Sequence, residues 1–437
     1  MGIKYPAGLF FFMFYLDLIR ANRIQWNTYD EFNALQYAKF KKVFINAYKN
    51  VPYYRKLFVS SDIHPNDIKC LDDIKHIPFL EKSTIQSNPL IEFLDKRSNI
   101  KKLKVKSTGG STGNPLKIYL SKDEILKRTF IDYRCLKALG LKHYHKQVYF
   151  RDPDTFRKDS TYQKLGIFRR SYISIFDPVE VQVEKLNKLK SHIICGDPTI
   201  LETIGTYIKD HKGFESIKKN KFIISTSQLA SESELERISK YFNAPVYNFY
   251  GAIEFGVIGY QCKVGRKIHL NADSTYCEFI DTDFTLPGGI KGYEIICTTL
   301  DNLTMPLIRY RLGDIVIPSS EKCACGRILP LIEIVAGRKN EYILTKSGKK
   351  LPSILFTVTM RKYNFVNQFK IYQKKIDRLD IHLSVNDNFN EINKKQLISD
   401  IQELIGSKID INLEIKPEFK EEKPRKLKTI FSDLITT

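Results

Sequence analysis

Strand-like and helix-like patterns alternate between residues 192 and 251, and this alternation restricts the fold more than any other feature of the chain. The apolar run "HIICGD" precedes a helical pattern, "KFIISTS" precedes the amphipathic segment "SESELERISKYF", and "PVYNFYG" follows that segment. Short apolar runs separated by amphipathic helices are typical of parallel strands that helices cover on both faces. The sequence therefore predicts an α/β fold for this part of the chain.

Two later parts of the chain do not show this alternation of strand-like and helix-like patterns. Residues 265–335 show mainly strand patterns, with turns at "LPGG" and "SSEK". After "AGRKN", the runs "FKIYQ", "RLDIHLSV", "KKQLISDIQELIG" and "IDINLEI" predict a small α+β unit. Because 437 residues exceed one ordinary core, we expect several domains. We predict a large N-terminal α/β domain, residues 1–338, with a β-rich part at about 265–338, and a small C-terminal α+β domain, residues 339–437.

The chain is basic, with 70 Lys and Arg against 49 Asp and Glu, a net charge of +21. Such a field attracts anions, including nucleotide and coenzyme phosphates. The basic residues are scattered and form no zinc-finger, RNP or basic-zipper pattern, so we expect no nucleic-acid partner. Eight cysteines in a chain of this length do not make a disulfide framework, which favours a reducing, cytoplasmic location.

The N-terminal region begins with an uncharged, mostly apolar stretch, "YPAGLFFFMFYL", at residues 5–16. It is too short to cross a bilayer, which takes about 20 residues. We expect a helix packed on the body of the protein; the alternative is a peripheral contact with a membrane surface. Residues 30–58 then show helical spacing that stops near Val51 and Pro52.

The stretch "KSTGGSTGNPLKIYL", residues 106–120, is rich in glycine and hydroxyl side chains and lies between two strand-like runs. Its glycines and hydroxyl residues are Ser107, Thr108, Gly109, Gly110, Ser111, Thr112 and Gly113. Glycines let successive backbone N–H groups turn toward an anion, and hydroxyls add donors, which is what an anion nest requires. The loop lacks the Gly-Lys-Ser/Thr ending of a Walker loop. By itself it favours a phosphate loop and a tight hairpin equally.

Other motifs make the phosphate loop the better interpretation. "TGGSTGNPL" resembles the phosphate loop of the adenylate-forming superfamily, which contains the acyl-CoA synthetases. "FYGAIEFG" at 249–256, "RYRLGD" at 309–314 and "AGRKNEYI" at 336–343 resemble further motifs of that superfamily, in its order. Within it, "AYKNVPYYRKLF", "DIKHIPFLEK", "TMPLIRYRLGD" and "CACGRILP" are similar to the phenylacetate–CoA ligase and CapK-like capsular polysaccharide branch. The resemblance implies an adenylate-forming N-terminal α/β domain and a C-terminal domain that acts as a mobile lid.

The resemblance also implies a site for ATP and Mg²⁺. The loop would bind the triphosphate, Tyr250 and Gly251 would lie against adenine, and Asp314 would accept hydrogen bonds from the ribose. Glu254 would hold Mg²⁺, which takes carboxylate and phosphate oxygens. Arg338 would add a cation near the ribose or phosphate, and Lys426 would be the catalytic lysine. The plainer alternatives are a strand-end turn at Tyr250, a turn at Asp314, a surface cation at Arg338 and a solvated tail around Lys426.

The chain departs from the superfamily pattern at four positions. Ile253 stands where Thr or Ser usually precedes the glutamate, and Arg425 stands where glycine usually precedes the tail lysine. Asn340 takes the hinge aspartate position, and Gln228 replaces a glutamate after "ISTS". These departures keep open a second hypothesis, a nucleotide-binding scaffold with a degenerate site.

A separate set of residues has the composition of a structural zinc site. Cys262, His269, Cys323 and Cys325 form a C-x6-H and C-x-C pattern, and four such ligands suit a closed tetrahedral Zn²⁺. Members of the resembled branch that carry this pattern support a structural zinc. The alternative is four unlinked residues, and Cys277 reads as an ordinary buried thiol.

These features together predict an enzyme. We expect ATP-dependent activation of a small carboxylic acid to an acyl-adenylate, followed by transfer to an acceptor. The acceptor is CoA, a carrier-protein thiol or a sugar amine, and the resemblance to the CapK branch makes a role in surface polysaccharide biosynthesis plausible.

Overall fold

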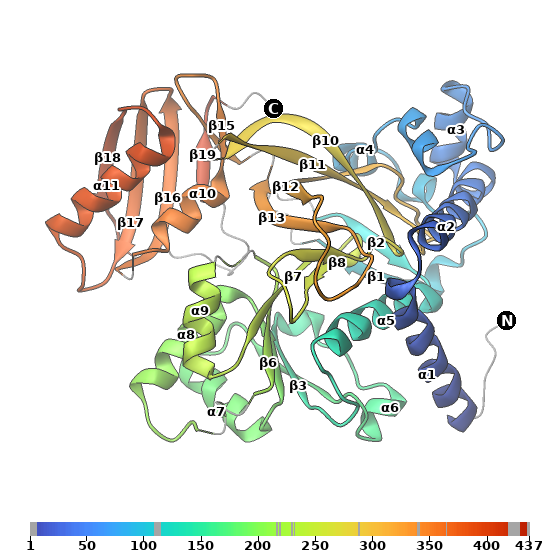
Figure 1. Cartoon of the computed structure of the whole chain (residues 1–437), viewed down its shortest axis with the longest axis horizontal. Coiled ribbons are helices and arrows are strands. Elements are labelled where there is room, and N and C mark those ends of the chain that lie inside the picture. The colour runs from blue at the N-terminus through green and yellow to red at the C-terminus, as the bar shows by residue number, and fades with distance from the viewer. Residues whose placement is uncertain are drawn as a thin grey trace.

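The computed structural model describes residues 7–108, 115–215, 217, 220–228, 230, 232–286, 289–338, 341–363, 365–417 and 429–434. For residues 7–14, 334–336, 338 and 354 it describes only the backbone. Within these ranges the chain forms one large sheet, one small sheet and a two-stranded hairpin, with helices on the faces of both sheets (Figure 1).

The large sheet has thirteen strands in the order β14-β15-β10-β11-β12-β13-β9-β8-β7-β6-β5-β3-β4. Its parallel part consists of β3 (Gln147–Arg151), β4 (Arg170–Ser174), β5 (Ile193–Gly196), β6 (Phe222–Ser225) and β7 (Val246–Ala252). Its antiparallel part consists of β8 (Gly256–Gln261), β9 (Ile268–Leu270), β10 (Thr275–Leu286), β11 (Ile290–Thr299), β12 (Tyr310–Ser319) and β13 (Leu331–Arg338). The predicted α/β region and the strand-rich region after it are confirmed.

Helices cover both faces of the parallel strands (Figure 1). One face carries α7 (Val179–Leu189), α8 (Pro198–Asp210) and α9 (Glu232–Phe242), which pack on Val148, Ile194 and Ile223. The other face carries α5 (Lys122–Ala138), which packs on Ile193 and Cys195, and the short α6 (Thr161–Lys164) lies nearby. Neighbouring residues of β5 thus point to opposite helical layers, which explains the continuous apolar run in "HIICGD".

The N-terminal helices precede this sheet and share a core with its antiparallel strands. They are α1 (Ala7–Arg23), α2 (Tyr29–Asn50), α3 (Pro52–Ser60) and α4 (Lys82–Ser87). Thr28 and Glu31 form a capping box at the start of α2, and Pro52 begins α3, where its missing N–H costs nothing. Phe40 and Phe44 of α2 belong to the same core cluster as Cys297 of β11.

Helix α1 contains much of the apolar N-terminal stretch and lies beside α5 (Figure 1). Its Leu18, two residues after the apolar stretch, is buried in the core cluster that α5 shares with the sheet, so the C-terminal part of this helix packs on the body of the protein. Tyr15 and Ile19 are exposed. Among the described residues, no helix has the length and apolarity that crossing a membrane requires.

The C-terminal part builds its own four-stranded sheet, with the order β18-β17-β16-β19. Its elements are β14 (Tyr342–Leu344), β15 (Lys350–Pro352), α10 (Ser353–Met360), β16 (Val366–Lys375), β17 (Arg378–Val385), α11 (Glu391–Ile405), β18 (Asp410–Ile415) and β19 (Ile430–Ser432). Ile343, Phe356, Ile381, Ile401 and Ile430 contribute to a core of this part alone. This separate core supports the division at residue 338, which stays a prediction, because the β14–β15 hairpin pairs with β10 of the large sheet.

Candidate active site

The glycine-rich stretch connects two antiparallel strands, as expected. β1 (Lys104–Ser107) pairs with β2 (Lys117–Leu120), with Ser107 opposite Lys117. Thr108 closes the base of the loop, because its N–H donates to the Leu116 carbonyl at 2.9 Å and its Oγ1 accepts from the Leu116 N–H at 2.8 Å. Gly109, Gly110, Ser111, Thr112 and Gly113 lie outside the described residues. The described part of the hairpin therefore holds both ends of the loop at a fixed separation.

Tyr250 and Asp314 are 64 residues apart in sequence and meet at the boundary between the two parts of the large sheet. The Tyr250 hydroxyl donates to Asp314 Oδ2 at 2.8 Å, and Asp314 is only 6% exposed. Burial and then the Asp314 charge raise the pKa of Tyr250 well above its usual value, so the phenol keeps its proton. Asp314 follows Gly313, whose φ of +78° favours glycine.

Glu254 lies in the turn after β7, four residues beyond Tyr250. A Cβ on Gly251 would meet the Gly256 carbonyl oxygen at 2.6 Å, so this hairpin needs glycine. Glu254 is 7% exposed, and its Oε1 accepts from the Tyr310 hydroxyl at 3.4 Å. Arg128 of α5 donates to the carbonyls of Ile253 and Glu254 and so fixes the turn. The sequence analysis missed Arg128, since no motif contains it.

Of two other predicted residues, the structure describes only the backbone of Arg338, and Lys426 lies outside the described residues. The backbone of Arg338, in β13, pairs with Asp314, which puts that position beside the Tyr250 pair, while its side chain is outside the described set. Lys426, Arg425 and Asn340 also lie outside the described residues. Ile253, the departure beside Glu254, is 41% exposed.

The four predicted zinc ligands converge from β9, the residue after β8, and the turn between β12 and β13. Their ligand atoms all lie within 4.8 Å of one another, with Cys262 and His269 buried. Cys262 Sγ lies 3.7 Å from Cys323 Sγ, and Cys325 Sγ lies 3.4 Å from His269 Nε2. Tetrahedral coordination at about 2.3 Å for sulfur and about 2.0 Å for nitrogen requires separations of about 3.8 Å between two sulfurs and about 3.5 Å between sulfur and nitrogen. The cluster therefore has the dimensions of a zinc site.

The charge state of His269 suits a metal ligand as well. Burial, and then the nearby Arg327 charge, lower the pKa of His269 to about 4, so its ring is neutral at pH 7. Cys277 is not a member: it lies across β10–β11 from Cys297, as its strand-like context predicted. Arg327 also donates to Gln25 Oε1 at 2.9 Å and lies over the Trp26 ring, which connects the cluster to the segment after α1.

The C-terminal part contacts the N-terminal part through Arg361, which the sequence analysis did not identify. Arg361 follows α10, and its guanidinium pairs with Glu234 of α9, whose side chain is 1% exposed. It also donates to Gln228 Oε1 at 3.3 Å and to Thr199 Oγ1 at 3.4 Å. Gln228 is one of the departures from the superfamily pattern, and here its amide oxygen accepts from the arginine.

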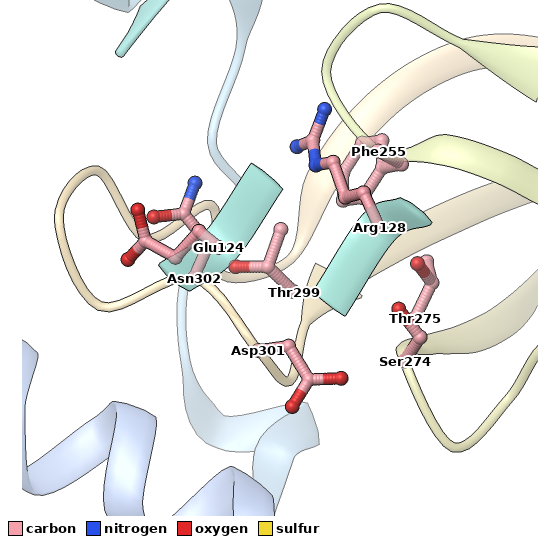
Figure 2. Close-up of a pocket in the computed structure, with 8 residues that line it drawn as sticks. All are labelled: Glu124, Arg128, Phe255, Ser274, Thr275, Thr299, Asp301 and Asn302. Carbon is pink, nitrogen blue, oxygen red and sulfur yellow. The ribbon is translucent and has the colours of Figure 1, made fainter. Parts of the chain in front are cut away.

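A small cavity lies beneath Arg128, between Glu124, Thr299 and Asp301 (Figure 2). Its volume of about 10 Å³ holds roughly one water molecule. Glu124 accepts from the N–H groups of Leu303 and Thr304 and from that of Ser121, so its carboxylate caps backbone segments. This cavity is structural, and it is distinct from the site around Tyr250.

Curated relatives cover most of the chain at low identity. Phenylacetate-coenzyme A ligase of Aromatoleum evansii is 25% identical over 413 residues, 88% of this chain and 90% of that protein. The ligase of the same name from Thermus thermophilus is 21% identical over 86% of each chain. Protein CapK of Staphylococcus aureus is 23% identical over 89% of this chain and 86% of its own. No protein-family model matches the chain.

Solved structures show the same fold. 2-Hydroxyisobutyryl-CoA ligase in the postadenylation state, in complex with 2-HIB-AMP, has a TM-score of 0.79 and covers 94% of this chain and 92% of its own, at 14% identity. The same ligase with 2-HIB-AMP and CoA in the thioesterification state has a TM-score of 0.64. Since one protein supplies both comparisons, this chain superposes better on the postadenylation form of that protein than on its thioesterification form. The relatives, the fold and the meeting of the motifs at one site make this chain similar to the adenylate-forming superfamily, and within it to the branch of the phenylacetate–coenzyme A ligases and CapK.

Proposed function

We propose that this protein is an ATP-dependent acid–CoA ligase that activates a carboxylic acid as its acyl-adenylate and transfers the acyl group to CoA. The observation that carries the proposal is the buried contact between Tyr250 and Asp314, beside Glu254, at the carboxyl end of β7. In open α/β sheets, ligands bind at the carboxyl ends of the parallel strands. The relatives named phenylacetate-coenzyme A ligase support the reaction class.

Each residue has a role that its position allows. The Tyr250 ring lies against adenine while its hydroxyl holds Asp314, which accepts from the ribose hydroxyls. The loop from Ser107 to Gly113 would bind the triphosphate, and Thr108 keeps together the two described ends of the loop. Arg338, whose backbone pairs with Asp314, would supply a cation for the ribose or phosphate. These groups align the α-phosphate with the attacking carboxylate, which is where positioning and charge stabilisation act.

Glu254 is the proposed ligand for Mg²⁺. A buried carboxylate at the edge of the nucleotide site fits a hard cation, and Tyr310 and Arg128 fix its position. The bound ion would neutralise phosphate charge during adenylation. Lys426 is the proposed catalytic lysine, whose ammonium would stabilise charge as the acid oxygen attacks.

The C-terminal part is proposed to act as a lid that changes its position between adenylation and transfer. The acceptor in the proposal is CoA; a carrier-protein thiol and a sugar amine are the alternatives that the assay below separates. We also propose a role in surface polysaccharide biosynthesis, because the chain resembles the CapK branch. A cytoplasmic location, with or without a peripheral membrane contact through residues 5–16, is likewise proposed, and the eight free thiols support it.

The cluster of Cys262, His269, Cys323 and Cys325 is proposed to bind one structural Zn²⁺. Four protein ligands leave no open position for water, so the ion would stabilise the fold without taking part in the reaction. It would tie the turn between β12 and β13 to β8 and β9, the strands that follow the Glu254 turn.

The test is pyrophosphate release across a panel of carboxylic acids, with and without CoA, alongside calorimetric titration with ATP and Mg²⁺. The proposal expects ATP binding, acid-dependent pyrophosphate release, and thioester formation only when CoA is present. Asp314→Asn should weaken ATP binding, while Arg378→Gln, on the outer sheet of the C-terminal part, should leave it unchanged. ATP binding without turnover on any acid would favour the scaffold hypothesis. The exposed Ile253, which stands where Thr or Ser is usual, is one reason for that hypothesis.

A further inference from the structure

Five basic side chains gather on the α5 face of the parallel strands, next to the proposed phosphate loop. They come from five different segments, namely β1, α5, β3, the loop after β3, and β4. The five are Lys106, Arg128, Arg151, Arg157 and Arg170. No sequence motif unites them, and only the fold brings them together.

Carboxylates offset the charge of this cluster only in part: Asp132 acts on Lys106, Arg128 and Arg170, and Glu124 and Glu254 act on Arg128. In the described part of the chain, none of the five cations forms an ion pair. The charges that act on Lys106 are those of Arg157, Arg128 and Arg151 against the single carboxylate of Asp132. Burial and these arginines lower the pKa of Lys106 to about 7. The cluster therefore holds a surplus of positive charge in a partly desolvated position, which is costly unless an anion binds.

Aromatic rings, and not carboxylates, hold the arginines in place. The Arg151 guanidinium lies 5.2 Å from the centre of the Tyr149 ring, and Arg170 lies 5.6 Å from the same ring and 5.0 Å from that of Tyr133. Burial raises the pKa of Tyr149 to about 12, so its phenol is neutral and leaves the positive charge intact. The Nε of Arg170 is buried and has no hydrogen-bond partner among the described residues. The rings fix the guanidinium groups while leaving N–H donors for a ligand.

The cluster lies beside the proposed site, toward β3. Arg151 ends β3, which is three positions from β7 in the sheet order β7-β6-β5-β3. At about 4.8 Å per strand this places it roughly 14 Å from the strand that carries Tyr250. Arg128 spans the distance, since it contacts the Glu254 turn directly. A molecule that reaches from the nucleotide's α-phosphate toward β3 extends into these cations.

We propose that the carboxylic acid substrate carries a second anionic group, a carboxylate or a phosphate, which Lys106, Arg151, Arg157 and Arg170 bind. The inference rests on the proposed ligase function and names its substrate class. The reacting carboxylate lies at the nucleotide, and the distal anion takes the hydrogen bonds that the guanidinium groups leave unused. An apolar monocarboxylic acid would instead bury these cations without a counter-charge.

The experiment compares acids that differ only in the distal group. Adipate is paired with hexanoate and succinate with butyrate, and 3-phosphoglycerate with glycerate tests a phosphate. For at least one pair, kcat/KM for pyrophosphate release should be about 10- to 100-fold higher with the diacid or phosphorylated acid, the scale of one or two charge-assisted hydrogen bonds. Equal kcat/KM values within all three pairs would overturn the inference while leaving the ligase function intact.

Variants test whether the cluster binds the acid or ATP. Arg157→Gln, at an exposed loop position where folding is not at risk, should lower kcat/KM for the anionic acid about 10-fold or more and leave the KM for ATP unchanged. Arg169→Gln removes the same charge from an exposed neighbouring position and should change neither. If Arg157→Gln raises the KM for ATP and spares the acid preference, the cluster binds phosphates of the nucleotide and the inference is wrong.

A binding measurement keeps the inference testable if turnover is absent. Calorimetry with adipate and with hexanoate, in the presence of ATP and Mg²⁺, should show tighter binding of adipate to the wild type and loss of that difference in Arg157→Gln. Equal affinity of both acids overturns the inference. A preference for adipate without any pyrophosphate release supports the subsite and counts against the ligase function, so the two failures are distinguishable.

Discussion

Replacing Arg361 by Met should weaken the adenylation step selectively, because this arginine holds the C-terminal part in its present position. Its guanidinium reaches Glu234, Gln228 and Thr199, which all belong to the N-terminal part. A charge-assisted hydrogen bond contributes about 1.5–3 kcal/mol, and Arg361 is 22% exposed, so solvent screening is limited. The population of this arrangement should therefore fall by up to about 10- to 150-fold relative to other lid positions.

The assay measures the two half-reactions separately. Exchange of labelled pyrophosphate into ATP reports adenylation, and it should fall by about 10- to 100-fold in Arg361→Met. Thioester formation from a preformed acyl-adenylate and CoA should stay near the wild-type rate, since we propose that this step uses a different lid position. Arg378→Met is the matched control, because its partners Asp380 and Asp410 belong to the C-terminal sheet itself. It should leave both half-reactions unchanged.

Two outcomes would refute this reasoning. An equal loss in both half-reactions, together with a lower unfolding midpoint, would mean that the Arg361–Glu234 pair only stabilises the fold. No change in either would mean that the pair costs as much in desolvation as it contributes, which buried ion pairs often do. The double variant of Arg361→Met with Glu234→Gln should lose little more than Arg361→Met alone, because the two residues act through one contact.

Three further predictions concern the zinc cluster, the tail and the basic cluster. Protein purified without chelator should contain about one equivalent of zinc by elemental analysis, and Cys323→Ser should lower the unfolding midpoint by about 5 °C or more; no zinc, or an unchanged midpoint, contradicts the site. Lys426→Ala should lower kcat for pyrophosphate release by about 10²- to 10³-fold with little change in ATP affinity, and a large loss in Lys428→Ala instead would place the catalytic lysine two residues later. The pKa of Lys106 falls from 10.5 to about 7 on folding, so between these pH values the unfolded chain binds more protons at Lys106 than the folded chain does. This residue therefore makes the free energy of unfolding rise with pH across that window. Lys106→Met should remove a slope of up to about 1.4 kcal/mol per pH unit in denaturant titrations, and identical slopes in both proteins would show that this lysine is not desolvated.

Local patterns sufficed for several of the helices and strands. The run "KFIISTS" became β6 because every residue of Phe222–Ser225 is buried, and Pro52 separated α2 from α3 as its missing N–H requires. The pairing of β15 with β10 was not predictable, since it depends on Lys350 meeting Phe284 across 66 positions of sequence. A local pattern contains no information on which distant edge a short hairpin will join.

The residues of the candidate site likewise fall into those that local motifs reveal and those that only tertiary contacts reveal. Motifs identified Tyr250, Glu254 and Asp314, because each has a fixed neighbour in sequence, such as the positive-φ Gly313. Arg128 and Arg361 have no such neighbour, and in a chain with 70 basic residues a lone arginine does not stand out. Their roles follow from tertiary contacts with backbone carbonyls and a buried carboxylate. The motifs therefore identified the residues of the proposed nucleotide site, but not the arginines that position them.

The basic cluster and the Arg361–Glu234 contact would act over different parts of the reaction sequence. Adenylation consumes the reacting carboxylate, but a distal anion keeps its charge in the acid, in the acyl-adenylate and in the thioester. Contacts from Arg151 and Arg157 to that anion would thus persist while the Arg361–Glu234 pair breaks and the lid moves. The intermediate would be held at both ends, by Asp314 at the ribose and by the cluster at the acyl chain, during the interval when the lid no longer encloses it. In this arrangement the cations near β3 contribute to specificity and also to retention of a hydrolysable intermediate.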